Sequence, residues 1–113
     1  MSRENKVDYE ANMHLHVLLV EEEGTYIAHC LEIGASGQGK TEKETIQDLI
    51  GCIKAHIEES IETGTPESIF NPAPPEYWQM YYNSLITKAR NRSLINPRFL
   101  LRGDFSNLEV VHA

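Results

Sequence analysis

The chain has 113 residues, a formal net charge of -7 at pH 7 and 41% hydrophobic side chains. This length suits one domain with a single hydrophobic core, and the composition is that of an ordinary globular protein rather than a disordered or collagen-like chain. The longest apolar run in the N-terminal half, residues 15–20, is far shorter than the roughly twenty residues of a membrane-spanning helix, so we expect no contact with a membrane.

Localisation and redox state follow from the N-terminus and the cysteines. The opening residues, MSRENKVDYEAN, lack the basic flank and small-residue cleavage site of a secretory signal, so we expect a cytoplasmic protein. Cys30 and Cys52 lie outside any Cys-x-x-Cys pair, and we expect both to be reduced and mostly buried. Cys30 has no base beside it in the sequence and is interpreted as a core residue rather than a nucleophile.

The charge is unevenly distributed along the chain. Residues 1–87 carry fifteen acidic and five basic side chains, whereas residues 88–102 carry five basic side chains and no acidic one. A body this acidic repels phosphate backbones and attracts a basic partner. We interpret the basic stretch as a solvated helix end and the loop after it, because cations near a helix C-terminus are stabilising.

An alternating pattern predicts a β-strand from Asn12 to Val20. Residues 22–24 are turn material, and the segment 25–33 follows at hairpin distance, which predicts an antiparallel partner. Residues 35–39, ASGQG, are predicted to form a short edge strand or a bulged extension that pairs back on the second strand. The two faces of the first strand carry Met13, Leu15, Val17 and Leu19 on one side and His14, His16, Leu18 and Val20 on the other.

An amphipathic helix is predicted to follow. Thr41 and Glu44 form a capping box at its start, and Gly64 suits the left-handed conformation that ends a helix. Its apolar stripe consists of Ile46, Leu49, Ile50, Ile53, Ile57 and Ile61.

The C-terminal residues contain a connector, a second helix and two apolar runs. Residues 65–75, TPESIFNPAPP, are rich in helix breakers, and Pro75 is predicted to begin a helix that ends near Arg92. Residues 99–101 and 108–111 are predicted either to pair with each other or to extend the sheet. The stripe of the second helix consists of Trp78, Tyr81, Tyr82, Leu85, Ile86 and Ala89.

These elements predict an α+β fold with a β-β-β-α core, in which an antiparallel three-stranded sheet carries one amphipathic helix. We expect a single domain over residues 1–113. Its core covers residues 12–64, and a C-terminal extension over residues 65–113 adds the connector, the aromatic helix and the short strands.

Residues 34–41, GASGQGKT, match the Gly-x-x-x-x-Gly-Lys-Thr pattern of phosphate-binding loops through Gly34, Gly39, Lys40 and Thr41. In such loops backbone amides bind phosphates, the lysine reaches the outer phosphates and the threonine holds magnesium. This match makes a nucleotide-binding or nucleotide-hydrolysing protein an alternative function.

The context of the motif disfavours that alternative. Glu42 and Glu44 occupy the helix start where an anion would bind, and the capping box uses its amides. The strands before the loop are one hairpin apart and therefore antiparallel, whereas nucleotide-binding folds of this kind have parallel sheets. Asp104, the nearest candidate for a magnesium ligand, lies in turn-like sequence. We interpret the match as a chance resemblance and expect no cofactor.

The segments EGTYIAHCLEIG, ASGQGKT and TEKETIQDLIGCIKAHIEESIE resemble the HicB family of antitoxin-like proteins over residues 15–64. The shared features are a strand, a Gly-Tyr-like hairpin, a second strand near a Cys-x-Glu-Leu-like sequence, a short Gly-containing strand and a Thr-x-x-Glu helix start. Here CLEIGASG lacks the Pro-x-x-Pro-Gly run that is usual after the second strand.

The resemblance implies a partial RNase H fold, frequent dimerisation and binding of a small basic ribonuclease toxin of the HicA type. We therefore expect a homodimeric, non-enzymatic antitoxin of a type II toxin–antitoxin pair that acts by protein–protein contact. The C-terminal residues show no helix-turn-helix or ribbon-helix-helix pattern, so we expect no DNA binding and no operon repression.

The acidic residues do not suggest catalysis. Metal-dependent nuclease chemistry needs several acids that converge on a divalent ion. We expect the acids of the predicted turn and of the first helical turn to be solvated rather than catalytic. They are Glu21, Glu22, Glu23, Glu42 and Glu44.

Three histidines suggest a metal site. His14 and His16 share one face of the first strand, and His29 on its neighbour can point to the same side, where three imidazoles can hold zinc. The alternative is that they cover a partly exposed sheet face or a dimer seam. We favour that alternative and expect no metal, because no spacing for a fourth ligand is evident.

The aromatic residues of the second helix have two interpretations. Tyr77, Trp78, Tyr81 and Tyr82, next to Arg90 and Arg92, can stack on bases, which makes RNA binding through residues 77–102 an alternative function. Such a stripe is more often core or interface, and we favour an association surface. The predicted partner or dimer surface consists of His14, His16, Trp78, Tyr81 and Tyr82.

Overall fold

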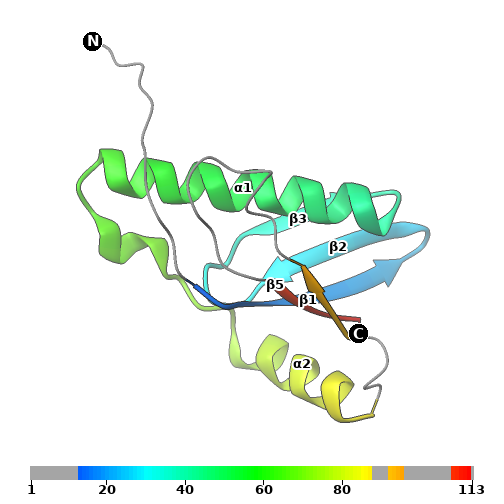
Figure 1. Cartoon of the computed structure of the whole chain (residues 1–113). Helices are drawn as coiled ribbons and strands as arrows, with labels where there is room; N and C mark the ends of the chain where they lie inside the picture. Colours follow the sequence, from blue (N-terminus) through cyan, green and yellow to red (C-terminus); the bar gives the residue numbers. More distant parts are fainter. Residues whose placement is uncertain (1–12, 88–91, 96–107, 113) are drawn as a thin grey trace.

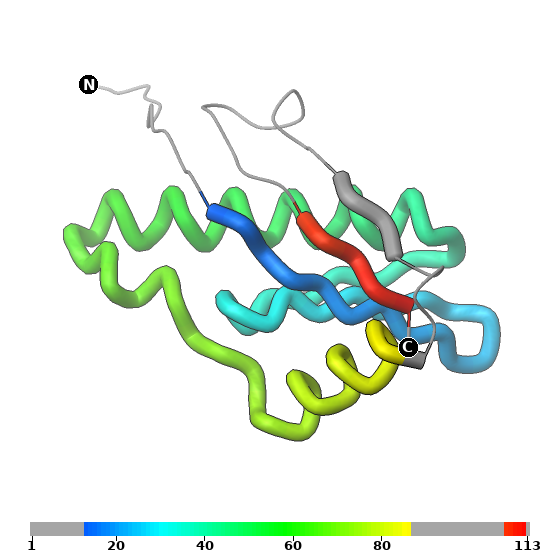
Figure 2. Tube along the Cα trace, turned by 60° about the horizontal axis from the view of Figure 1, so that its bottom comes forward, coloured from blue at the N-terminus to red at the C-terminus, as the bar shows by residue number. Residues whose placement is uncertain are grey.

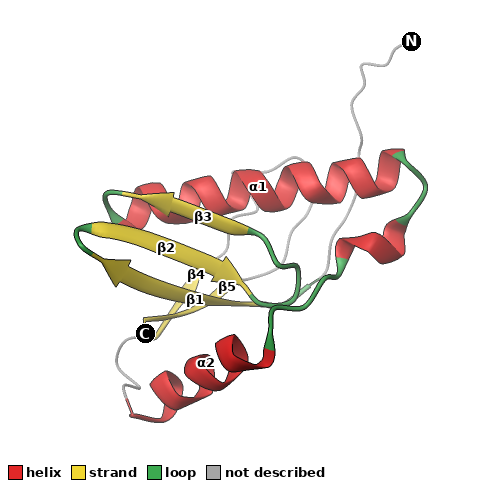
Figure 3. Ribbon diagram, turned by 180° about the vertical axis from the view of Figure 1, so that it is seen from behind, coloured by secondary structure: helices red, strands yellow, loops and turns green. Residues whose placement is uncertain are grey.

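A computed structural model of the chain describes residues 13–87, 92–95 and 108–112. The predicted α+β class is confirmed: a mixed sheet lies between two helices, α1 on one face and α2 on the other (Figure 1, and from behind Figure 3). The strands of the sheet stand in the order β3-β2-β1-β5-β4. In chain order the elements are β1 (Leu15–Glu22), β2 (Thr25–Cys30), β3 (Ser36–Gly39), α1 (Glu42–Glu62), the 3-10 helix η1 (Pro66–Ile69), α2 (Pro75–Thr87), β4 (Arg92–Ile95) and β5 (Leu108–His112).

The predicted hairpin and edge strand are confirmed. β1 and β2 pair antiparallel, and β3 pairs antiparallel with β2 at the edge of the sheet. The β1–β2 turn has positive φ angles at Glu23 (52°) and Gly24 (80°), which is the left-handed geometry that a two-residue hairpin needs. β2 ends at Cys30 instead of residue 33, because the chain turns there and the Gly34 amide donates to the Cys30 carbonyl at 2.8 Å.

The C-terminal extension completes the sheet. β5 lies beside β1 (Figure 2, red beside blue) and pairs parallel with it. β4 pairs antiparallel with β5, so the sheet that the described residues form is five-stranded and mixed rather than three-stranded. The prediction that the second helix ends near Arg92 is wrong. Arg92 begins the strand β4, and the backbone of β4 pairs with that of β5. The predicted runs at residues 99–101 and Ala89 lie outside the described residues.

α1 covers one face of the sheet through a continuous core. Leu15, Val17 and Leu19 of β1 are at most 2% exposed and pack with the apolar side of α1. The predicted stripe of α1 is confirmed from Ile46 to Ile57, whereas Ile61 is 38% exposed. At that end α1 turns toward η1 instead of the sheet, since the buried Ser60 hydroxyl lies 3.0 Å from the Ser68 hydroxyl.

α2 packs on the opposite face through a second core. Leu18, Leu31, Tyr81 and Val111 form this cluster, and Tyr77, Trp78 and Leu85 pack against it. The predicted stripe of this helix is therefore displaced, because Tyr82 and Ile86 are 48% and 77% exposed. The placement of Tyr81 on a partner surface is wrong, since it is only 1% exposed.

The start and end of α1 confirm the predicted helix signals. The Thr41 hydroxyl accepts from the Glu44 amide at 3.1 Å, which is a cap worth about 1 kcal/mol. The Glu44 carboxylate accepts from the Lys40 amide at 3.2 Å, one residue earlier than the predicted reciprocal bond. Gly64, with φ of 72°, follows the last turn as predicted.

We predict that Gly37→Ala destabilises the protein by about 1–3 kcal/mol, because an added Cβ would overpack the contact between β3 and α1. That atom would lie 2.4 Å from the Leu49 amide nitrogen and 2.7 Å from its Cα, and backbone atoms of a helix cannot move aside alone. Unfolding in urea measures the change.

Gly51→Ala is the matched control. A Cβ at Gly51 has no other atom within 4 Å, so alanine there should stabilise the helix by about 0.5–1 kcal/mol. Equal stability of the Gly37→Ala variant and the wild type would contradict the close approach of β3 to α1.

Candidate functional site

The phosphate-loop motif spans two elements instead of one loop. Gly34 lies in the turn after β2, whereas Gly39 ends β3, so the residues between them belong mostly to a paired strand. The Gln38 amide donates to the Asp48 carboxylate at 3.0 Å, and the Lys40 amide donates to Glu44. The chain around Lys40 is a strand end followed by a helix cap, and these amides are already engaged within the protein.

The face of the sheet under α2 carries the three histidines, but only two of them meet. His14 and His16 lie in contact near the start of β1, with ring centroids 5.2 Å apart. His29 instead forms a hydrogen bond with the Ser36 hydroxyl at 3.0 Å and packs on Tyr77, with ring centroids 4.9 Å apart. The three-imidazole arrangement considered from the sequence is therefore not assembled.

Two glutamates complete the pair of histidines. His14 Nε2 lies 2.9 Å from Glu109 Oε1, and His16 Nδ1 lies 2.5 Å from Glu32 Oε2. Glu32 also accepts from the His16 backbone amide at 2.9 Å. We call these four residues, His14, His16, Glu32 and Glu109, the His–Glu cluster. It joins β1, the turn after β2, and β5.

The His–Glu cluster lies at the surface but is backed by protein. The His14 side chain is 50% exposed, whereas that of Glu109 is 12% exposed. The His16 ring contacts Tyr81 edge-on with centroids 5.4 Å apart, and Trp78 lies 6.1 Å away. Imidazoles and carboxylates in contact at a half-buried position can bind a cation or exchange a proton.

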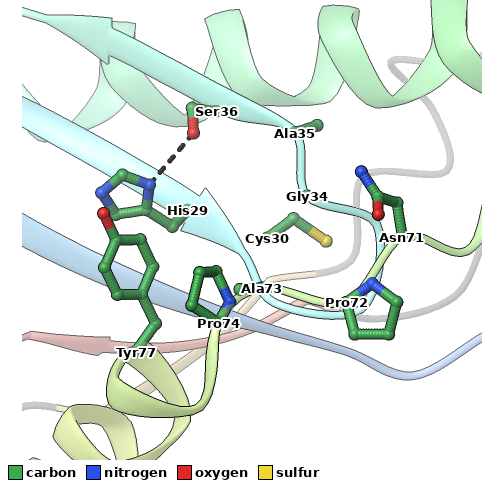
Figure 4. Close-up of a pocket in the computed structure, with 10 residues that line it drawn as sticks. All are labelled: His29, Cys30, Gly34, Ala35, Ser36, Asn71, Pro72, Ala73, Pro74 and Tyr77. Carbon is green, nitrogen blue, oxygen red and sulfur yellow. Dashed lines mark hydrogen bonds between the residues drawn. The ribbon is translucent and has the colours of Figure 1, made fainter.

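A small pocket lies between β2 and the segment that leads into α2 (Figure 4). Its volume is about 240 Å³, below the roughly 300–1,000 Å³ of sites for drug-sized ligands. The Asn71 and Ala73 amides hold the far wall by donating to the carbonyls of Glu32 and Leu31 at 3.1 and 2.8 Å. The lining residues are His29, Cys30, Gly34, Ala35, Ser36, Asn71, Pro72, Ala73, Pro74 and Tyr77.

Burial favours the neutral forms of two groups of the pocket, His29 and Cys30. Burial lowers the pKa of His29 from its ordinary value, and the nearby Glu22 opposes this only in part. Burial raises the pKa of the Cys30 thiol to about 12, so it stays protonated at neutral pH. This agrees with the interpretation of Cys30 as a core residue.

The two cysteines differ in exposure. Both are free thiols, and Cys30 is buried as expected. The prediction that Cys52 is mostly buried is wrong: it lies on the exposed side of α1, where its helical position points away from the sheet.

The remaining candidates are surface residues. The acids of the β1–β2 turn and of the first turn of α1 are exposed, as predicted for solvated groups. Trp78 and Tyr82 stack with ring centroids 6.3 Å apart, and Tyr82 is exposed. Arg90 lies outside the described residues, so the surface considered for RNA is described only in part.

Glu32 and Glu109 are the site residues that the sequence analysis missed. One feature of the sequence pointed to Glu109 as a site residue: it is an acidic residue within the apolar strand sequence LEVV. No feature of the sequence CLEIG pointed to Glu32, because its contact with His16 forms only when the chain turns back at the end of β2.

No protein-family model matches this chain, and neither the curated proteins nor the solved structures contain a significant match to it. Within the described residues, neither helix combines the length and the apolar character needed to cross a bilayer.

We predict that Cys52 alone reacts with a thiol reagent in the native protein. Cys30 is 0% exposed and its thiol stays protonated, whereas Cys52 is accessible to the reagent. Ellman's reagent at mildly alkaline pH should modify one thiol per chain in buffer and both in concentrated guanidinium chloride. The Cys52→Ser variant is the control, and fast labelling of that variant without denaturant would contradict the burial of Cys30.

Proposed function

We propose that the protein is a small acidic binding protein of the HicB-like antitoxin kind, which neutralises a basic ribonuclease toxin of the HicA type by protein–protein contact. The observation that carries this proposal is a row of solvent-accessible carboxylates along α1. The first two of them, Glu44 and Asp48, also accept hydrogen bonds from backbone amides at the end of β3. We call this row the acidic ridge; it consists of Glu44, Asp48, Glu58, Glu59 and Glu62.

The acidic ridge has the dimensions of a docking surface. Its first and last residues are eighteen positions apart, so at about 1.5 Å per residue it extends over roughly 27 Å. The exposed residues between Asp48 and Glu58 have small side chains: Gly51, Cys52 and Ala55. Lys54 of α1 is already paired with Glu58 at 2.9 Å. A basic protein surface would be steered toward such a row of like charges.

The arrangement of the core supports the same proposal. The order β1-β2-β3-α1, with β3 at the sheet edge and α1 laid over the sheet, is the order that the HicB resemblance implies for residues 15–64. The glycines and threonine of the GASGQGKT segment have structural roles in that order, as a turn, a strand end and a helix cap. This leaves little to support the nucleotide alternative.

Dimerisation is the second part of the proposal, and the outer side of α2 supports it. Tyr82 and Ile86 are one helical turn apart and are 48% and 77% exposed, and the Trp78 ring stacks on Tyr82. Exposed apolar side chains grouped on one helix mark association surfaces. A second copy of the chain, bound through this side of α2, would remove Ile86 from water.

We predict that Ile86→Glu weakens the dimer at least tenfold without unfolding the chain, because the side chain has few contacts within the protomer. Sedimentation equilibrium measures the dissociation constant. Gln79→Glu, an exposed position of the same helix, is the charge-matched control. A monomeric wild type at high concentration would contradict this part of the proposal.

We predict that the chain forms a complex with a small basic ribonuclease toxin of the HicA type, stable at low salt and weakened by added salt. Co-expression and a pull-down test whether it forms. Replacing Glu58, Glu59 and Glu62 with glutamine should slow association about tenfold, because it removes charges that steer the partner.

The matched control replaces Glu21, Glu22 and Glu23 of the β1–β2 turn with glutamine, which changes the net charge by the same amount. Association should be slowed much less by this change. No complex in low salt would contradict the antitoxin proposal, and equal effects of the two variants would contradict the acidic ridge as the contact surface.

A further inference from the structure

We propose that His14, His16 and Glu109 form a binding site for a divalent transition-metal ion, with zinc as the first candidate. One ligand atom from each of these three residues lies within 4.8 Å of the others. Imidazole nitrogens and a carboxylate oxygen are ligands that zinc and other first-row divalent ions accept. The site does not depend on the proposed function.

The backbone places these three side chains on one side of the sheet. His16 and Glu109 are directly opposite each other in the parallel pairing of β1 with β5, and His14 precedes His16 by two residues on the same face. The alternate residues, Leu15 and Leu108, are at most 1% exposed in the core under α1. The metal ligands therefore stand on strands that are anchored from behind, as a precise site requires.

The distances require only small side-chain movements. Ligand atoms at about 2.1 Å from a tetrahedral zinc ion lie roughly 3.4 Å from one another. His14 Nε2 and Glu109 Oε1 are already 2.9 Å apart. The His14 side chain is half exposed, so its rotation toward the centre of the group meets little resistance.

Glu32 supplies an independent sign of a metal site. Its carboxylate binds His16 Nδ1 and also accepts from the His16 backbone amide, so the ring is held with Nε2 as the remaining ligand nitrogen. Metal-binding histidines almost always have such an outer carboxylate or carbonyl partner, which orients the ring and raises its basicity. We therefore assign Glu32 as a positioning residue.

Three protein ligands leave one position of a tetrahedral ion open. Exposure of His14 gives water or an exogenous ligand access to this position, while the Trp78 and Tyr81 rings pack beside His16. His29 does not supply a fourth ligand here, because it is bonded to Ser36 at the pocket on β2. The ligand set thus differs from the three imidazoles considered from the sequence.

Zinc titration of the untagged, metal-free chain in competition with a chromophoric chelator tests the proposal. We expect one equivalent to bind with a micromolar or lower dissociation constant. His14→Ala and Glu109→Gln should each raise that constant at least tenfold, and Glu32→Gln should raise it about 10- to 100-fold. Cobalt substitution should give the visible absorption of a tetrahedral site without a thiolate charge-transfer band.

Two matched variants separate this site from casual binding. His29→Ala removes the third histidine of the same sheet face, and Cys52→Ser removes the exposed thiol; both should leave zinc affinity unchanged. Because the His14 side chain is half exposed, we expect the His14→Ala variant to fold, and circular dichroism checks this. This variant therefore tests the metal site even where the Glu109→Gln variant unfolds. Millimolar binding, or affinity unaffected by His14→Ala, would overturn the proposal.

Discussion

The central position of β1 is the constraint on which the rest of the structure depends. β1 pairs with β2 on one side and with β5 on the other, and apolar residues on both of its faces are buried. A strand with two buried faces needs a helix on each side, because otherwise Leu18 or Val17 would face water. The two buried faces of β1 therefore account for the helix–sheet–helix layers. They also account for the packing of α2 on the face opposite α1.

The two faces of the sheet have different roles. Under α1 the packing is mainly apolar and tight, and Gly37 lets the β3 backbone reach the helix at Leu49. Under α2 the apolar cluster around Tyr81 covers only part of the sheet, and polar residues occupy the remainder. The His–Glu cluster and the pocket at His29 both lie on this second face, where the sheet is not sealed by a long helix.

The acidic ridge and the His–Glu cluster suit different kinds of binding partner. Four of the five residues of the acidic ridge are exposed, all except Glu58. The effect of these charges on association acts over about a Debye length, which favours a large basic surface. The cluster is compact and half buried, which favours a small cation held at short range. They lie on opposite faces of the sheet, so the two proposals use different surfaces and do not compete for one.

The sequence by itself determined the elements that depend on near neighbours in the chain. The β1–β2 turn, the Thr41 cap, the Gly64 stop and the alternation of β1 all involve residues within a few positions of one another. Those signals also explain why GASGQGKT is a strand end and a helix cap. The acidic excess that forms the ridge was visible from composition alone.

Only the tertiary structure decided the parallel pairing of β5 with β1, the burial of Tyr81 and the meeting of His14 with Glu109. His14 and Glu109 are 95 positions apart, and nothing local indicates which strand will lie beside β1. The periodicity of the sequence located the apolar stripe of α2 only roughly. It did not indicate which edge of the stripe faces the sheet, because that depends on how the helix packs on the sheet. Contacts between residues far apart in the sequence depend on how the whole chain packs to bury its apolar surface. No short segment specifies them.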